Sequence, residues 1–506
     1  MKPTKFLFLL FLVFCGGQSA TAQMFTDDAS FGINGVVNTD FYMNSWTAEN
    51  QELYKSYLVD DNKILATGSN QLARFNEEGS LDTGFATDGK FVLPSGYGLN
   101  GIEINTNFIY IYGYKANSAV GTDAFVAKLD TDGNVVSGFG TNGYFVFGLN
   151  ENETFNSLQF TDDNKLLAFG IKRTDPWSKL FITRISQDGT LDTNFQNNGY
   201  KEIYVFPINT NDIKYVYQNA SNEFVVFCTG RFDVNSYSNY MAVLKVDGEG
   251  NTVQGFNNGQ TYFESYGGYL NNFKTFNGKV YYTSLANDGS YSDAGLIRRN
   301  PETLAIETSV NVHWDVSDFL VDENENITVL STGNYNYSIP ENRDVDVRKY
   351  SRESEDDSYT VEWGYHFNLS DINSFNTDDL PSNLHFYDDK MLITGNSQIP
   401  QSGVNGMKYT MRRFNFNPLS NDEFGKKNVY LYPNPVSDIV NMDVSALDFP
   451  LTVDIFNTAG QLVNHQLLKD NLAHISIDMS TLPSGIYYVS TKDGNTVSQT
   501  NKLIKQ

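Results

Sequence analysis

Short apolar segments separated by polar turns run through most of the chain, and their pattern is typical of β-strands. Residues 124–129 alternate, with Phe125 and Leu129 on one face and Lys128 on the other, which is the two-residue period of a strand. Residues 108–112 are apolar at every position, as expected for a strand buried between two sheets. No segment shows a sustained helical period, so the pattern predicts an all-β protein.

One element recurs along the chain: an aromatic residue followed four positions later by glycine. This Phe–Gly element occurs as Phe31 and Gly35, Phe85 and Gly89, Phe139 and Gly143, and Phe195 and Gly199, with a shortened copy at Phe256 and Gly259. The successive phenylalanines are 54, 54, 56 and 61 residues apart. Spacing this regular is the signature of a repeat protein.

Two further features recur with the same period. The first is a polar turn followed by an apolar strand that ends near glycine, as in residues 60–68 and 162–170. The second is a strand with a basic residue at a fixed place, which in successive copies is Arg74, Lys128, Arg184, Lys245, Arg299, Lys349 and Arg413. Each feature occurs seven times, so we predict seven repeats, although the later copies have lost the full Phe–Gly element.

Each repeat has room for four short strands. In the second repeat we predict these strands at Phe91–Leu93, Ile102–Asn105, Phe108–Tyr112 and Ala124–Leu129. Such units bury their faces most economically in a closed ring, so residues 23–416 are predicted to form a seven-bladed β-propeller. Because the element at Phe31 precedes the first full repeat, we expect Val36–Phe41 to lie in the first blade and the preceding residues to latch the seventh. A β-sandwich or a solenoid is the alternative.

The repeat is similar to that of a known family. Its Leu-Asp-Thr-x-Phe-x-x-x-Gly sequence, its Asp-Asn-Lys turn and its in-phase basic residue resemble the delta-60 repeat of bacterial β-propeller-like proteins. The resemblance is most specific for residues 31–200 and extends over about 31–416. It implies a propeller fold and a surface or secreted location, and it implies no particular activity.

The chain changes character after Phe416. Residues 417–428 are polar, rich in turn formers and out of the repeat register, so they are predicted to be a linker. Residues 429–506 contain several short strands, no cysteine and no helical pattern, which predicts a small antiparallel β-sandwich.

This C-terminal module strongly resembles the type A sorting domain of Bacteroidota type IX secretion cargo. The resemblance rests on Tyr432, Pro433, Asn434 and Pro435, on Asp454 and Gly460 in the segment 454–460, on Leu482, Gly485 and Tyr487, and on the terminal Lys502 and Lys505. It implies Sec export, outer-membrane passage directed by this module, and a partner in the type IX secretion machinery. It also implies removal of the module, with the cargo then released or attached to surface lipopolysaccharide; the linker is the natural place for that cut.

The N-terminus predicts the same destination. Lys2 and Lys5 precede an apolar run over residues 6–14, and Ala20 and Ala22 supply small residues for cleavage, so residues 1–22 are predicted to be a signal peptide. A lipidated Cys15 is the alternative, although Phe14 is bulky for the residue before a lipidated cysteine. Cleavage would leave only Cys228, which lies in an apolar run and is predicted to be buried.

Composition narrows the range of partners. The formal charge of −25 argues against nucleic acid, which requires a basic surface. Acidic turns such as residues 130–134, 247–251 and 322–326 could gather oxygens for calcium, but they lack the length of an EF-hand loop, so we interpret them as hairpin turns. We therefore expect no cofactor, with calcium as the alternative.

The candidate binding and catalytic residues are few. His313, His366 and His385 form no recognised metal-binding spacing, and a shared metal site near the axis is only an alternative to packing roles. Trp177 is predicted to lie in an inter-strand loop and is the candidate ligand-contact residue, whereas Trp363 is assigned to the Phe position of its repeat and to the core.

The in-phase basic residues have two interpretations. They could line the axis as a cationic ring, but we expect them to pair with carboxylates such as Asp82 and Asp192, because their repetition favours a structural role.

The combined prediction is an exported, non-catalytic binding or scaffold protein, with surface glycans or proteins as partners. The alternative is a secreted hydrolase or lyase acting on polysaccharide, since such chemistry requires only two well-placed carboxylates and no pair can be selected among 60 acidic residues.

Overall fold

The structure is a computed structural model, and its strands fall into two separate units. It describes residues 25–43, 54–119, 121–174, 177–206, 209–232, 239–266, 268–286, 294–312, 315–334, 343–353, 358–370, 379–398, 407–416, 430–432, 436, 438–443, 451–457, 461–469, 474–493 and 496–505. Residues Phe25–Phe416 form one compact unit, and Asn417–Gln506 belong to the other. No helix within the described ranges is long and apolar enough to cross a membrane.

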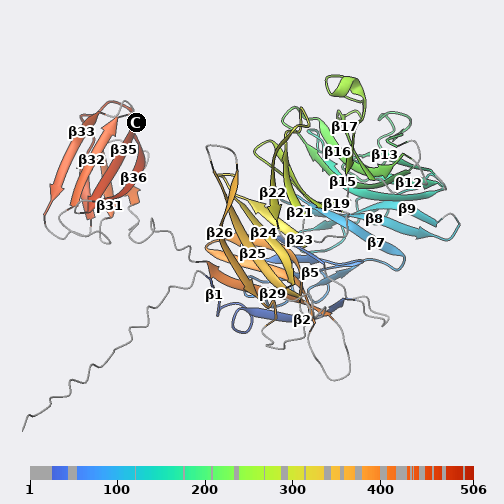
Figure 1. The fold of residues 1–506 in the computed structure, drawn as a ribbon, viewed down its shortest axis with the longest axis horizontal. Helices are drawn as coiled ribbons and strands as arrows, with labels where there is room; N and C mark the ends of the chain where they lie inside the picture. The colour runs from blue at the N-terminus through green and yellow to red at the C-terminus, as the bar shows by residue number, and fades with distance from the viewer. Residues whose placement is uncertain are drawn as a thin grey trace, which may run out of the picture. The chain divides into compact units, whose positions relative to one another are not determined.

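The strands of the first unit pair antiparallel in chain order (Figure 1) and fall into six groups of four and a last group of five; single parallel pairings join group 2 to group 3 and group 3 to group 4. Group 1 is β3 (Lys55–Leu58), β4 (Ile64–Thr67), β5 (Gln71–Phe75) and β6 (Lys90–Val92). Group 2 is β7 (Tyr97–Ile104), β8 (Phe108–Asn117), β9 (Gly121–Asp130) and β10 (Tyr144–Phe147). Group 3 is β11 (Asn152–Phe160), β12 (Leu166–Thr174), β13 (Trp177–Ile185) and β14 (Tyr200–Ile203). Group 4 is β15 (Asn209–Gln218), β16 (Phe224–Arg231), β17 (Asn239–Val246) and β18 (Tyr262–Tyr266).

The later groups follow the same order. Group 5 is β19 (Gly268–Phe276), β20 (Lys279–Ala286), β21 (Ala294–Arg299) and β22 (Ile306–Val312). Group 6 is β23 (Asp315–Val321), β24 (Ile327–Asn334), β25 (Arg343–Arg352) and β26 (Tyr359–Phe367). Group 7 is β27 (Asp379–Tyr387), β28 (Lys390–Gln398) and β29 (Met407–Phe416), completed from the N-terminus by β1 (Phe25–Asp27) and β2 (Val36–Met43). Two short 3-10 turns, η1 (Asp60–Asn62) and η2 (Asn257–Gly259), lie between strands.

The first strands of the groups lie next to one another and connect the end of the series to its beginning. Contacts run from β7 to β11, β15, β19, β23 and β27 in turn, and β27 contacts β3 of group 1. Apolar side chains fill the space between neighbouring groups; between groups 1 and 2, for example, Leu72 and Phe85 pack with Ile109 and Phe125. Each group therefore buries its faces against its neighbours.

The N-terminal strands complete the last group, which corrects the expectation for Val36–Phe41. Strand β2 pairs with β29, with Val36 opposite Arg412, and β1 pairs with the end of the same strand. The reason is general: the strand after each Phe–Gly element is the fourth strand of the group before it. In this arrangement Arg413 donates its backbone N–H to the Gly35 carbonyl at 2.8 Å. For the same reason, the predicted strand Phe91–Leu93 corresponds to β6 and belongs to group 1 rather than to the second repeat.

The second unit contains two antiparallel sheets around one core. One sheet contains β30 (Tyr430–Tyr432), β31 (Ile439–Asp443) and β34 (His474–Asp478). The other contains β33 (Leu462–Leu468), β32 (Leu451–Asn457), β35 (Gly485–Asp493) and β36 (Thr496–Lys505). Val440 and Ile477 of the first sheet pack with Val453, Val489 and Leu503 of the second.

Candidate functional site

The recurring basic residues lie in third strands and join neighbouring groups. Arg74 Nε donates to Asp82 at 2.7 Å, and its Nη1 donates to the Thr131 carbonyl in the next group. The guanidinium also lies 4.7 Å from the centre of the Phe85 ring. We call this set of contacts the junction lock.

The junction lock recurs at two more junctions. Arg184 donates to Asp192 at 2.8 Å and to the Gly248 carbonyl at 3.3 Å, and its guanidinium lies 4.9 Å from the centre of the Phe195 ring. Arg413 donates to Asp28 at 2.8 Å and to the Glu77 carbonyl at 2.6 Å, and its guanidinium lies 4.6 Å from the centre of the Phe31 ring. The predicted pairing with Asp82 and Asp192 is confirmed. A cationic axial ring is contradicted for these arginines, because their side chains are buried at the junctions.

The Phe–Gly element fixes the junction sterically. The Phe85 ring packs on a turn glycine of the next group, where a Cβ on Gly133 would lie 2.6 Å from that ring. The glycine that ends the element turns the chain into the fourth strand: Gly35, Gly89, Gly143 and Gly199 all have φ between +87° and +98°, a region that glycine adopts without a steric penalty.

Three of the other recurring basic residues have different partners from those of the junction lock. Lys128 has three aromatic rings around its ammonium, with Phe108 the nearest at 3.8 Å, and burial lowers its pKa. Lys245 pairs with Glu302 of the next group. Arg299 forms a two-bonded pair with Glu264 at 2.7 and 3.0 Å.

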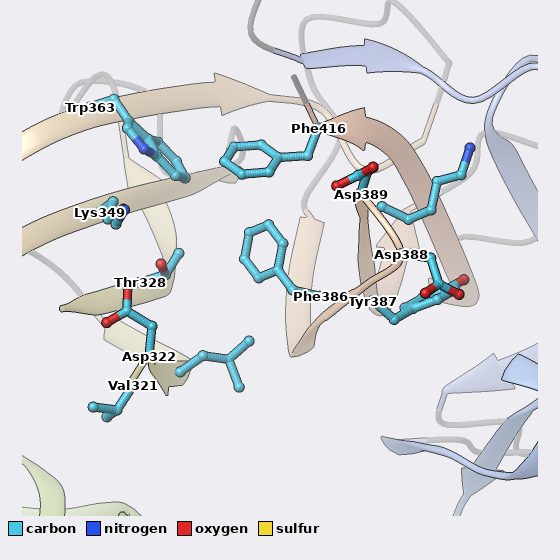
Figure 2. Close-up of a pocket in the computed structure, with 12 residues that line it drawn as sticks. Val321, Asp322, Thr328, Lys349, Trp363, Phe386, Tyr387, Asp388, Asp389 and Phe416 are labelled. Atoms are coloured by element: carbon cyan, nitrogen blue, oxygen red, sulfur yellow. The ribbon is translucent and has the colours of Figure 1, made fainter. Parts of the chain in front are cut away.

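A cleft opens between groups 6 and 7, where the sequence lacks the Phe–Gly element. It has a volume of about 490 Å³ and lies between the ends of β23 and β27 (Figure 2). The rings of Trp363, Phe386 and Phe416 line the cleft. Lys349 and Thr328 lie near Trp363, and Asp388 and Asp389 lie on the other side of Phe386. We call it the 6–7 cleft.

Its aromatic wall is held by contacts between strands of both groups. The Phe416 ring centre lies 5.9 Å from that of Trp363 and 5.3 Å from that of Phe386, and Phe25 lies 5.1 Å from Trp363. Trp363 is the fourth-strand residue opposite Lys349. In group 1 the residue in this relation to the equivalent Arg74 is Gly89, whose carbonyl accepts from the Arg74 backbone N–H. The assignment of Trp363 to the Phe position is therefore wrong: it stands at the glycine position and is only half-buried.

The polar groups of the 6–7 cleft include donors and acceptors. Lys349 pairs with Glu362 at 3.1 Å; burial opposes ionisation of Glu362, but hydrogen bonds from Ser351 and Lys349 outweigh it and lower the pKa of Glu362. Among the described residues, the Trp363 Nε1 has no hydrogen-bond partner. Asp389 is exposed at the rim. The Trp363 Nε1 is buried, so the cleft itself combines aromatic faces with the Lys349 ammonium and the Asp389 carboxylate.

The predicted ligand-contact residue lies elsewhere. Trp177 is the first residue of β13 and pairs with Thr174, since only two residues separate β12 from β13. The expectation of a loop position is therefore wrong, and the side chain of Trp177 lies outside the described part of the structure.

His366 and His385 lie on different strands and have different partners. His385 is on a first strand, where its Nε2 lies 2.8 Å from Ser56 Oγ and burial lowers its pKa to about 4. His366 is on a fourth strand and bonds to Asp344 at 3.1 Å, which raises its pKa. His313 is outside the described residues, and within those residues no cluster of three or more metal-ligating side chains occurs.

The acidic turns use their carboxylates internally. Asp130 accepts from the Asn134 backbone at 2.8 Å, and Asp322 accepts from the Asn326 backbone at 2.9 Å. These contacts match the hairpin interpretation. Cys228 is fully buried, as predicted, and burial raises its pKa.

The sorting residues occupy the second unit as follows. Asp454 is buried in β32 and lies 2.6 Å from His465, and the Tyr487 hydroxyl donates to the Pro483 carbonyl at 2.7 Å. Leu482 packs on the core. Tyr432 ends β30, Gly485 begins β35, and Lys502 and Lys505 lie in β36 opposite Tyr488 and Gly485. Pro433, Asn434, Pro435 and Gly460 lie outside the described residues.

Comparisons with known proteins identify both units. Residues 430–506 match the secretion system C-terminal sorting domain, and residues 60–85 match a family described as a domain of unknown function (DUF5122) beta-propeller. The chain therefore carries a C-terminal sorting domain and a β-propeller, and the former indicates export by type IX secretion to the cell surface or beyond. No curated protein matches the chain.

Several solved structures resemble the chain in fold alone. The polysaccharide lyase Uly1 has a TM-score of 0.44 at 10% identity, with 78% of this chain and 97% of that chain covered. The β-propeller domain of the Trilobed protease from Pyrococcus furiosus has a TM-score of 0.34 at 10% identity, covering 74% and 95%. A protein of unknown function from Bacteroides caccae has a TM-score of 0.34 at 11% identity, covering 60% and 93%.

Proposed function

We propose that this protein is an exported binding protein whose propeller holds a saccharide in the 6–7 cleft. The observation that carries this proposal is the set of three aromatic rings around the space, at a junction where the Phe–Gly element is missing, as it also is between groups 5 and 6. A departure from the repeat favours a binding role, because a feature present in every copy favours a structural one.

The chemistry of the 6–7 cleft fits a sugar ring. The C–H faces of a pyranose pack on aromatic rings, and its hydroxyls donate to carboxylates and accept from N–H groups. Trp363, Phe386 and Phe416 supply the faces, Asp389 supplies an acceptor, and the Lys349 ammonium supplies a donor.

The finer architecture is also part of this proposal. Seven successive groups and the contact between β27 and β3 support a seven-bladed ring spanning residues 23–416. The two sheets that share one core support a β-sandwich at residues 429–506.

The export route completes the proposal. Residues 1–22 direct Sec export, the module at 429–506 directs passage through the outer membrane, and cleavage falls in 417–428. The mature chain is then released or attached to surface lipopolysaccharide. Deleting 429–506 is expected to retain the protein in the periplasm, and its appearance in the medium would contradict this route.

The binding test is a glycan array with the mature chain, run with calcium and with chelator. We expect a defined glycan signal that falls at least tenfold in Trp363→Ala and Phe386→Ala. The control is Tyr204→Ala, which removes an aromatic ring that is 69% exposed and distant in sequence from the cleft. A signal unchanged in both cleft variants would refute the site, and loss of signal in chelator would assign calcium to it. Release of reducing ends or unsaturated products would instead support the polysaccharide-degrading alternative.

A further inference from the structure

A second cleft lies between groups 1 and 2. It has a volume of about 900 Å³ and is bounded by the ends of β3 and β7 with their following turns. Leu58, Ile102 and Ile104 give it apolar walls, and Tyr57 and Glu103 add polar groups. We call it the 1–2 cleft.

Glu103 occupies a defined place in the repeat. Counted back from the hairpin turn that follows each first strand, Glu103, Gln159, Lys274 and His385 hold equivalent positions; they lie opposite Tyr110, Leu167, Tyr281 and Leu392.

In groups 1, 4 and 6 the same position holds Tyr57, Tyr217 and Leu320. Three of the six other residues at this position bond to the next group. Gln159 Nε2 donates to the Val216 carbonyl at 3.2 Å, Lys274 Nζ donates to the Phe319 carbonyl at 2.5 Å, and His385 Nε2 bonds to Ser56 Oγ at 2.8 Å. An ionised carboxylate can only accept hydrogen bonds. Ionised Glu103 therefore cannot donate to a backbone carbonyl as Gln159 and Lys274 do.

The surroundings leave the carboxyl of Glu103 without a cation. Lys63 and Arg74, the basic residues of the 1–2 cleft, both bond to Asp82, at 3.1 and 2.7 Å. Within the described residues no hydrogen bond or ion pair reaches the Glu103 carboxyl.

The remaining titratable groups that face Glu103 do not supply a positive charge. They are Tyr57, Tyr112 and Tyr215, together with Asp60, Asp61 and Asp132 of the cleft lining. Burial accordingly raises the pKa of Glu103 to about 7.

We propose that the 1–2 cleft binds an aliphatic primary amine, with the ammonium group paired to Glu103 and the alkyl chain against Leu58 and Ile104. The protein provides an internal precedent. In group 5 the ammonium of Lys274 joins the Asp318 carboxylate, at 2.6 Å, to the Phe319 carbonyl. At Glu103 the carboxylate belongs to the protein, so the ligand supplies the ammonium. This inference is independent of the saccharide proposal.

Calorimetry with the full chain at pH 8 tests the proposal, using hexylamine as the probe and 1-hexanol as its uncharged match. We expect hexylamine to bind at least tenfold more tightly than hexanol, and Glu103→Gln to remove that difference. Glu78→Gln, an exposed carboxylate outside the cleft, is expected to bind like the parent. Lowering the pH from 8 to 6 protonates Glu103 and is expected to weaken hexylamine binding in the parent but not in Glu103→Gln.

A second variant keeps the test independent of folding effects. Glu103→Lys places an ammonium at the position that Lys274 holds in group 5, where it can donate to a backbone carbonyl as Lys274 does to Phe319, so it is expected to fold and to lose amine binding. Absence of hexylamine binding, equal binding of hexanol, or full amine affinity in Glu103→Gln would each overturn the proposal.

Discussion

Arg413 Nε donates a hydrogen bond of 2.8 Å to Asp28, a residue 385 positions earlier in the chain. The pair is buried, since Arg413 is 2% and Asp28 4% exposed. Lys390 approaches the same carboxylate at 3.0 Å. This junction lock joins the last group to the N-terminal segment, so the stability of the whole unit depends on it.

Asp28→Asn is expected to destabilise the unit strongly, because it leaves the buried Arg413 without its counter-charge. Breaking a buried pair costs about 3–5 kcal/mol. Asp27→Asn is the control: Asp27 pairs with Arg412 at 2.9 Å nearby but is 40% exposed, and an exposed pair contributes about 0–1 kcal/mol. Chemical denaturation of both variants measures the difference, and equal losses would contradict the assignment.

Asp379 is expected to make the free energy of unfolding depend on pH. It is fully buried, and burial raises its pKa to about 7, although the Leu369 N–H donates to it at 2.7 Å. The unfolded carboxyl titrates near 3.9. The folded state therefore holds the proton more tightly, and the free energy of unfolding should fall as the pH rises from about 4 to 7, by about 1.4 kcal/mol per unit.

Asp379→Asn is expected to remove this loss. The variant should exceed the parent in stability at pH 8, with the difference shrinking to nothing near pH 4. Urea unfolding at several pH values provides the measurement. A difference between the two proteins that does not change with pH would show that Asp379 titrates normally.

Gly133→Ala tests the steric part of the junction lock. Gly133 has φ +80°, and an added Cβ would lie 2.6 Å from the Phe85 ring, so we expect a loss of about 1–3 kcal/mol. Gly138→Ala is the matched control in the same connection: nothing lies within 4 Å of its Cβ position, and the change should stay within about 0.5 kcal/mol. Thermal melts of the two variants should separate clearly.

Arg74→Met and Lys128→Met should differ although the two residues are equivalent. Arg74→Met breaks a buried pair with Asp82, leaving Lys63 as its remaining partner, and should cost about 2 kcal/mol or more. Lys128 contacts aromatic rings, so methionine fills the same space without a buried charge and should cost less than about 1 kcal/mol. A larger loss in Lys128→Met would show that its cation–π contacts dominate.

The repetition in the sequence made much of the fold predictable. The eight-residue spacing from Arg74 to Asp82 recurs from Arg184 to Asp192, so a structural pair could be inferred before the structure was known. The positive-φ glycines were visible for the same reason. Val36–Phe41 was assigned to the wrong sheet because a repeat in sequence does not say where the structural unit begins.

The 6–7 cleft could not be predicted. Phe386 and Phe416 come from different strands, and Trp363 takes the glycine position, so their convergence depends on register rather than on spacing. The sequence also did not show that the Glu103 carboxyl is partly buried without a partner among the described residues. That becomes visible only when equivalent first-strand positions are compared through their strand pairing. The missing Phe–Gly element was visible in the sequence, but it is missing between groups 5 and 6 as well and so does not locate the cleft.

The pairing of β2 with β29 sets an order of events during synthesis. Strands β1 and β2 are made first, yet both pair with β29, which ends at Phe416, so they cannot pair until the last group has been synthesised. The sorting domain is translated only after that partner. A chain that stops short of β29 therefore lacks both the partner of β1 and β2 and the sorting domain, so the sorting domain is carried only by chains that already contain every described strand of the first unit.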